Sequence, residues 1–175
     1  LTPSTIVNVG VTLDPLAGVM VVVVSFVSLL IFIYSIGYMH GDPRYPRFFA
    51  YLSLFGASML GLVLANNLLA LYLCWELVGL CSYFLIGFWF ERPAAARAAK
   101  KAFLVTRFGD TAMLVGILYL ILQAGTAQLP LVFEKIQSGL LPQSVLTVAA
   151  VLIFCGAMGK SAQFPLHVWL PDAME

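Results

Sequence analysis

Residues 16–34 of this chain read LAGVMVVVVSFVSLLIFIY, a segment rich in Val, Leu, Ile and Phe that contains no charged residue. A helix needs about 20 predominantly apolar residues to cross a hydrocarbon core of about 30 Å. Four more apolar runs of suitable length follow, at about residues 48–65, 68–90, 101–124 and 143–161. We therefore predict an all-α fold, a polytopic membrane helix bundle with about five transmembrane helices.

The composition of the chain supports a membrane protein and excludes an ordinary soluble domain. Apolar residues make up 62% of the 175 residues and charged residues only 10%, whereas soluble domains carry about 25% charged residues. The net charge is +1 and no basic stripe is present, so nucleic acid is not expected as a partner. The expected surroundings are a lipid bilayer.

The segments outside the apolar runs have their own expected forms. Residues 1–15 alternate loosely between apolar and polar, which predicts a short strand or hairpin at the membrane surface. Residues 125–142 are expected to form a loop on the outer side, with a short amphipathic piece at about 132–136. Pro165 predicts that the last helix is broken. Because the chain starts at Leu1 and stops at Glu175 just after this break, we interpret residues 1–175 as one transmembrane domain, an internal fragment of a longer subunit.

The basic residues predict the orientation of the helices. The loops at 37–47 and 91–101 lie at the same end of a five-helix bundle. They contain Arg44, Arg47, Arg92, Arg97, Lys100 and Lys101, whereas the loops at the other end contain only Lys135. Since cytoplasmic loops carry an excess of Lys and Arg, the first pair of loops is expected on the cytoplasmic or equivalent side.

Four ionisable residues lie inside the apolar runs: Glu76, Arg107, Asp110 and Lys160. Glu76 is roughly 13 Å into its helix at 1.5 Å per residue. Each such residue costs about 2.5–3.5 kcal/mol at a helix centre on the insertion scale. These side chains are therefore expected to face the interior of the bundle, one another or water.

Two interpretations of these charges remain open at the level of the sequence. They could be packing ion pairs, and Arg107 with Asp110, three residues apart on one helix, is then the pair to expect. Alternatively, Glu76 and Lys160 form a switching pair in an ion path, because Lys160 lies beside the predicted helix break where water could enter. His167 is a candidate relay in such a path, or else a structural or interfacial histidine.

Several motifs in order along the chain resemble the large antiporter-like subunit of respiratory complex I, the family called subunit L in bacteria and subunit 5 in mitochondria. These motifs are Tyr38 to Asp42, Arg47 to Leu52, Trp75 to Tyr83, Thr106 to Asp110, Gly159 to Pro165 and Trp169 to Glu175. The resemblance implies a membrane-arm subunit of a proton-translocating NADH–quinone oxidoreductase, with a proton half-channel driven by electron transfer in other subunits.

The resemblance also implies roles for individual residues. Glu76 and Lys160 would translocate protons, Arg107 and Asp110 would modulate the charge, and His167 would be a possible relay. No cofactor or metal is expected on this chain, while NADH, FMN, iron–sulfur clusters and quinone belong to partner subunits of the membrane arm and beyond. The expected location is the bacterial inner membrane, with mitochondrial and thylakoid membranes as alternatives.

Other complexes carry a similar subunit, and they are the competing functions. Multi-subunit sodium/proton antiporters, membrane-bound hydrogenases and inorganic-carbon uptake complexes share the Trp-Glu and Gly-Lys-Ser motifs. A further alternative is a membrane scaffold that transports nothing and uses its buried charges only to hold helices together.

Overall fold

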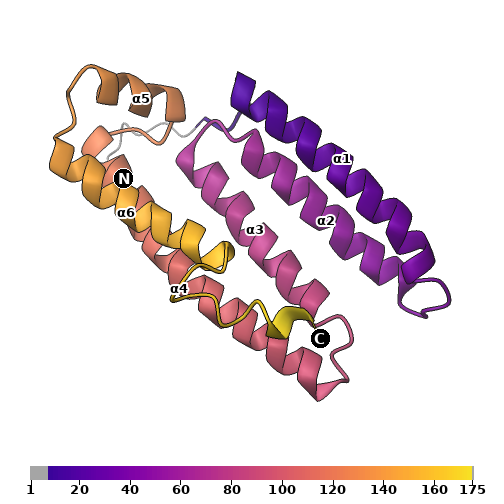
Figure 1. The fold of residues 1–175 in the computed structure, drawn as a ribbon. Coiled ribbons are helices and arrows are strands. Elements are labelled where there is room, and N and C mark those ends of the chain that lie inside the picture. Colours follow the sequence, from indigo (N-terminus) through magenta and orange to yellow (C-terminus); the bar gives the residue numbers. More distant parts are fainter. Residues whose placement is uncertain (1–7, 175) are drawn as a thin grey trace.

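The computed structural model describes residues 8–174, and within this range it contains helices and no strand (Figure 1). The helices are α1 (Pro15–Tyr38), α2 (Tyr45–Val63), α3 (Leu68–Ile86), α4 (Pro93–Ala124), α5 (Leu129–Gln137), α6 (Gln143–Lys160) and the short 3₁₀ helix η1 (Asp172–Met174). Five of those in the described range are long and apolar enough to cross a membrane, namely α1, α2, α3, α4 and α6. The predicted helical membrane fold is therefore confirmed.

The five long helices form a row in which sequence neighbours pack side by side. Helix α2 packs between α1 and α3, α3 packs between α2 and α4, and α6 packs along α4 (Figure 1). Helix α4 is thus in contact with both α3 and α6. This position matters for the site, because α4 carries two of the four buried charges.

Helix α4 begins earlier than its apolar run predicts. It starts at Pro93 and is 32 residues long, whereas the sequence predicted a start near residue 101. The extra turns are mostly alanine, the residue with the best helix propensity, and Pro93 occupies the first helical position, where its missing N–H costs nothing. Helix propensity rather than apolar character therefore sets this boundary.

Helices α4 and α6 approach each other closely through glycines. A Cβ atom on Gly109 would lie 2.7 Å from the carbonyl oxygen of Cys155, and one on Gly156 would lie 2.8 Å from the Cβ of Met113. Small residues at such contacts allow helix backbones to approach in lipid. The charged residues near Gly109 are therefore brought close to α6.

One end of the bundle is organised around the turn between α2 and α3. The side chain of Asn67 is fully buried and accepts a hydrogen bond from the Ala70 N–H at 2.7 Å, which caps α3. The first seven residues of the segment predicted as a strand or hairpin lie outside the described residues. In its remainder, Val11 forms one isolated bridge with Ala65. The amphipathic piece at this end is the nine-residue helix α5.

The opposite end of the bundle joins the two basic loops. Arg44 forms an ion pair with Glu91 at 2.6 Å, and the indole of Trp89 donates a hydrogen bond to Asp42 at 3.1 Å. The hydrogen bonds from the Arg44 backbone N–H and from Trp89 lower the pKa of Asp42, and that from the Arg44 side chain lowers the pKa of Glu91. The structure thus places both loops at one end, as the orientation argument requires.

Candidate functional site

The four charged residues inside the apolar runs form two ion pairs across helix interfaces. Glu76 on α3 pairs with Arg107 on α4, and the Lys160 amine at the end of α6 lies 3.5 Å from the Oδ2 atom of Asp110 on α4. Each pair therefore has one member on α4 and the other on a helix packed against it. Together Glu76, Arg107, Asp110 and Lys160 form a row of alternating negative and positive charge across α3, α4 and α6, which we call the charged row.

The predicted pairing of Arg107 with Asp110 is wrong. The two residues lie one turn apart on α4, but each finds its partner on a different neighbouring helix. Glu76 and Lys160 do not contact each other, because each of them pairs with a residue of α4, and their role as a switching pair stays a prediction. Spacing along a helix identifies a common face, but it does not show which helices lie against that face.

Asp110 is the most buried member of the row. Its side chain is 0% exposed and accepts a hydrogen bond from the Trp75 indole N–H at 2.6 Å. Its other carboxylate oxygen, Oδ2, has no hydrogen-bond partner among the described residues and faces the Lys160 amine. A buried carboxylate needs a compensating charge, and Lys160 supplies it at a distance longer than a hydrogen bond.

The Lys160 amine occupies a place that a glycine leaves open. It lies against Gly79 of α3, where even a methyl group would collide with it, and 5.8 Å from the centre of the Trp75 ring. The side chain is 18% exposed. Trp75 and Gly79 are four residues apart and so share one face of α3, and that face receives both Asp110 and Lys160. Trp75 and Gly79 were not predicted as parts of the site, although the sequence shows that Trp75 directly precedes Glu76 and that Gly79 follows it by three residues.

The predicted break follows Lys160 directly. Helix α6 ends at this residue, and residues 161–171 run as turns before η1. The indole of Trp169 donates a hydrogen bond to the carbonyl oxygen of Gly159 at 3.0 Å, so the broken segment folds back over the end of α6.

A cavity of about 200 Å³ lies beside the Lys160 amine and is also lined by Ser82, Tyr83, Thr106 and Trp169. The cavity is large enough to hold water, although most of its lining is apolar. The amine of Lys160 therefore faces both Asp110 and a space through which protons could arrive.

The remaining members of the predicted site are placed less centrally. The Arg107 guanidinium lies 4.5 Å from the centre of the Phe103 ring and its side chain is 35% exposed, so it sits nearer the edge of the bundle than Asp110. His167 is exposed, and its ring packs 5.7 Å from that of Phe164. The structure does not bring His167 to the charged row, and its role as a relay stays a prediction.

The described part of the chain offers no cluster of three or more His, Cys, Asp and Glu side chains that could hold a metal ion. The cysteines at 74, 81 and 155 are free thiols. The site therefore offers four charged side chains, and one of them, Lys160, lies beside a cavity large enough to hold water.

A row of paired charges within a bundle of transmembrane helices is typical of membrane proteins that move ions. Comparison with known proteins defines the class further. Residues 65–175 match the family described as NADH:quinone oxidoreductase/Mrp antiporter, transmembrane, and residues 2–49 match NADH-ubiquinone oxidoreductase (complex I), chain 5 N-terminus. The chain belongs to the NADH:quinone oxidoreductase/Mrp antiporter family, and the resemblance inferred from its motifs is confirmed.

Individual relatives agree with this assignment. The chain is 54% identical over 172 residues to NAD(P)H-quinone oxidoreductase subunit 5, chloroplastic, of Zygnema circumcarinatum, covering 96% of this chain and 24% of that protein. It is 51% identical to NAD(P)H-quinone oxidoreductase chain 5 of Synechocystis sp., covering 96% of this chain and 25% of that protein. The chain thus spans about a quarter of the length of these relatives.

A solved structure, that of the Mrp complex from Dietzia sp., is also similar. It shares 36% sequence identity with a TM-score of 0.81, over 94% of this chain and 18% of the matched chain. The arrangement of helices in this chain is therefore also found in a chain of the Mrp complex.

Proposed function

We propose that this chain is part of the membrane arm of a proton-translocating NADH–quinone oxidoreductase, and that its charged row carries one proton half-channel. The observation that carries the proposal is the position of Lys160, which faces a buried carboxylate on one side and a cavity of about 200 Å³ on the other. A structural ion pair needs no such cavity, whereas a lysine that exchanges protons does.

In this proposal, Lys160 holds the proton and Asp110 sets how tightly it is held. The carboxylate of Asp110 stabilises the ammonium form of the lysine, and the indole of Trp75 keeps that carboxylate in place. Loss of the proton leaves the buried Asp110 without a counter-charge, which is unfavourable in an apolar interior. Protonation of Lys160 from the cavity restores the pair.

Glu76 and Arg107 act on this step from one turn away. While Glu76 holds Arg107, the guanidinium is kept from Asp110, its neighbour on the same face of α4. If Glu76 loses its charge, Arg107 is free to approach Asp110 and compete with Lys160 for it. The competition favours release of the proton from Lys160, so a change at α3 is passed through α4 to α6.

The partners and location of the protein follow from the same proposal. NADH, FMN, iron–sulfur clusters and quinone would be bound by partner subunits, and other membrane-arm subunits would pack against the helices. We propose a bacterial inner membrane as the location. The chloroplast and cyanobacterial relatives extend this to thylakoid membranes, and membrane fractionation of the source cells distinguishes the two.

The test uses the complete complex reconstituted in liposomes. Proton uptake or release is measured per NADH oxidised for the wild type, Glu76→Gln and Lys160→Ala. We expect both variants, once shown to be assembled, to pump fewer protons per electron pair. Wild-type pumping in both assembled variants would contradict the proposed role of the row.

A second candidate function is supported by the similarity to the Mrp complex. In that case the chain would belong to a multi-subunit sodium/proton antiporter, and the same charged row would exchange protons without electron transfer. The composition of the purified complex decides between the two. Flavin and iron–sulfur subunits that co-purify support the oxidoreductase, whereas sodium-dependent proton exchange without them supports the antiporter.

A further inference from the structure

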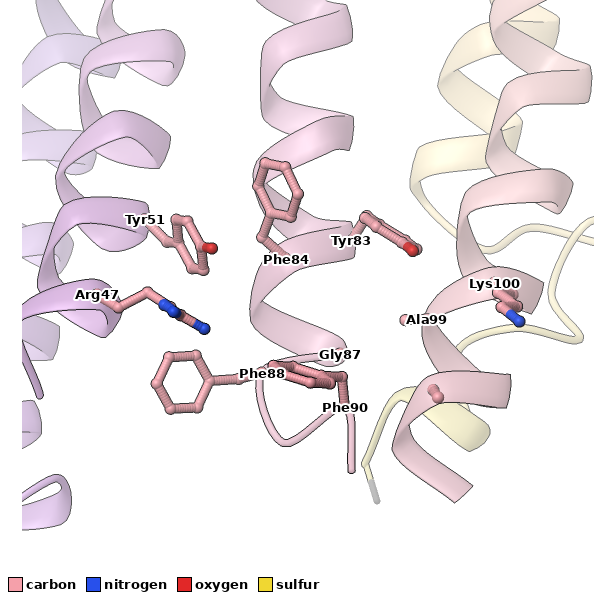
Figure 2. A pocket seen from close by; sticks show the side chains of 10 residues that line it. Arg47, Tyr51, Tyr83, Phe84, Gly87, Phe88, Phe90, Ala99 and Lys100 are labelled. Atoms are coloured by element: carbon pink, nitrogen blue, oxygen red, sulfur yellow. The ribbon is translucent and has the colours of Figure 1, made fainter. Parts of the chain in front are cut away.

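A second cavity, of about 350 Å³, opens at the end of the bundle where the two basic loops meet. It lies between the first turns of α2, the end of α3 and the first turns of α4. Figure 2 shows Arg47 extending from α2 into this space, with the rings of Tyr51, Phe84 and Phe88 around it and Lys100 on α4. The charged row takes no part in this cavity.

The two cations that line the cavity have no acidic partner in it. The cavity lining contains no Asp or Glu, and no salt bridge involves Arg47 or Lys100 among the described residues. The charge of Arg47 contributes to lowering the pKa of Glu91, but the carboxylate of Glu91 is paired with Arg44 at 2.6 Å. Two positive charges, both on exposed side chains, therefore line one cavity without an ion-pair partner among the described residues.

The helix ends make the absence of an anion more costly. Helices α2 and α4 both begin at this cavity, neither has a side-chain cap, and neither has an acidic residue in its first turn. Basic residues near the positive end of a helix are unfavourable. The end of α3, whose carbonyl groups carry partial negative charge, offsets only part of this. The excess of basic residues in cytoplasmic loops explains charge on this side of the membrane, but it does not explain cations that line an apolar cavity.

The rest of the lining is aromatic. The rings of Tyr51 and Phe84 stack at 4.9 Å, and Phe88 packs edge-on against Tyr51 at 6.5 Å. A small hydrated anion gains nothing from such a surface. A lipid does, because its phosphate can contact the cations while the start of its acyl chains lies against the rings. Basic pockets between transmembrane helices on the cytoplasmic side are suited to anionic head groups.

We propose that this cavity binds an anionic phospholipid, with its phosphate at one of the two lining cations, Arg47 on α2 or Lys100 on α4, and its acyl chains against the aromatic rings. The site lies at the level where the helices leave the membrane, which is the depth of the head groups. The inference does not depend on proton translocation, because it concerns a different cavity and is measured by lipid binding.

The test uses the complex that contains the full-length subunit, stripped of lipid in detergent. Binding of labelled phosphatidylglycerol is compared for the wild type, the cavity variant Arg47→Gln/Lys100→Gln and the control Arg92→Gln/Arg97→Gln. The control removes the same charge from the same side, but from two arginines that do not line the cavity. We expect the cavity variant to lose roughly tenfold or more in affinity at one site, and the control to bind as the wild type does.

Three outcomes would overturn the proposal. Equal binding by the wild type and the cavity variant would mean that the cavity takes no lipid, or that another segment of the subunit fills it. An equal loss in the control would mean a diffuse effect of surface charge. Competition by inorganic phosphate or by phosphatidylcholine, as strong as that by unlabelled phosphatidylglycerol, would exclude an anionic lipid as the specific occupant.

A second variant keeps the proposal testable if the cavity variant does not assemble. Ala96→Leu adds volume to the cavity lining without changing any charge. We expect it to weaken phosphatidylglycerol binding by obstructing the acyl chains. Unchanged binding in this variant would equally count against the site.

Discussion

Replacing Asp110 by Asn should stop proton transfer while leaving the shape of the site almost unchanged. Asparagine can still accept the hydrogen bond from Trp75, but it removes the negative charge that pairs with Lys160. At 3.5 Å and an effective dielectric constant of about 20, that charge attracts the ammonium group by about 5 kcal/mol. Loss of one partner of a buried pair typically costs about 3–5 kcal/mol, and Lys160 can avoid this cost by becoming neutral.

The assay for Asp110→Asn measures protons pumped per NADH oxidised, together with the thermal midpoint of the purified complex. The matched control is Asp172→Asn, the same chemical change in a carboxylate that pairs with Lys101 at 2.7 Å. That pair is close to half exposed on both sides, and an exposed pair contributes about 0–1 kcal/mol. Loss of the Lys101–Asp172 pair should therefore affect pumping less than loss of the Lys160–Asp110 pair, although its charged atoms are closer together.

The expected result is a strong loss of pumping in Asp110→Asn and wild-type pumping in Asp172→Asn. NADH oxidation should persist in both variants, because the proposed function places electron transfer in other subunits. Wild-type pumping by Asp110→Asn would refute the argument that this carboxylate holds the proton on Lys160. Equal losses of pumping in both variants would show that the burial of an ion pair does not determine its effect on pumping.

Further variants and conditions probe separate parts of the structure. Gly79→Ala should lower pumping while leaving the thermal midpoint almost unchanged, because the added methyl group meets only the flexible end of Lys160. Gly109→Ala should instead lower the thermal midpoint by the equivalent of about 1–3 kcal/mol, because its methyl group would meet the backbone carbonyl of Cys155, which cannot move aside. Hydrogen exchange should show the joined basic loops opening as the pH falls into the acidic range. The pKa of Glu91 is lowered in the folded protein by its guanidinium partner, so its stabilising effect is present above its unfolded pKa and is lost as the pH falls through the folded value.

The membrane fold could be predicted from the sequence because length and apolar character decide whether a helix crosses a bilayer. Residues 16–34 alone give one span, and all five spans appear in the structure. The helix boundaries could not be predicted as well where alanines continue a helix beyond its strongly apolar run. The start of α4 at Pro93 rather than near residue 101 is the clearest case.

The members of the charged row could also be predicted, because ionisable residues within apolar runs are costly and must face the interior. Their pairing could not. It depends on the order in which helices pack and on how each is rotated, and neither is encoded in the spacing along one helix. Arg107 and Asp110 share a face of α4, yet that face meets α3 and α6 together, and so the two residues acquire different partners.

The roles of Trp75 and Gly79 became visible only once the helices were placed. A tryptophan in a membrane helix is usually a packing residue or an anchor at the interface, and a glycine usually allows close packing. Here the indole holds Asp110, and the missing side chain of Gly79 leaves room for the Lys160 amine.

In the proposed mechanism, Lys160 releases and regains a proton rather than serving as a fixed counter-charge for Asp110. Lys160→Arg tests it most directly, because arginine keeps the positive charge but does not deprotonate in proteins. We predict that the Lys160→Arg complex assembles and oxidises NADH but pumps fewer protons per NADH than the wild type. Wild-type pumping by Lys160→Arg would show that the row only holds the helices together, and would contradict the account.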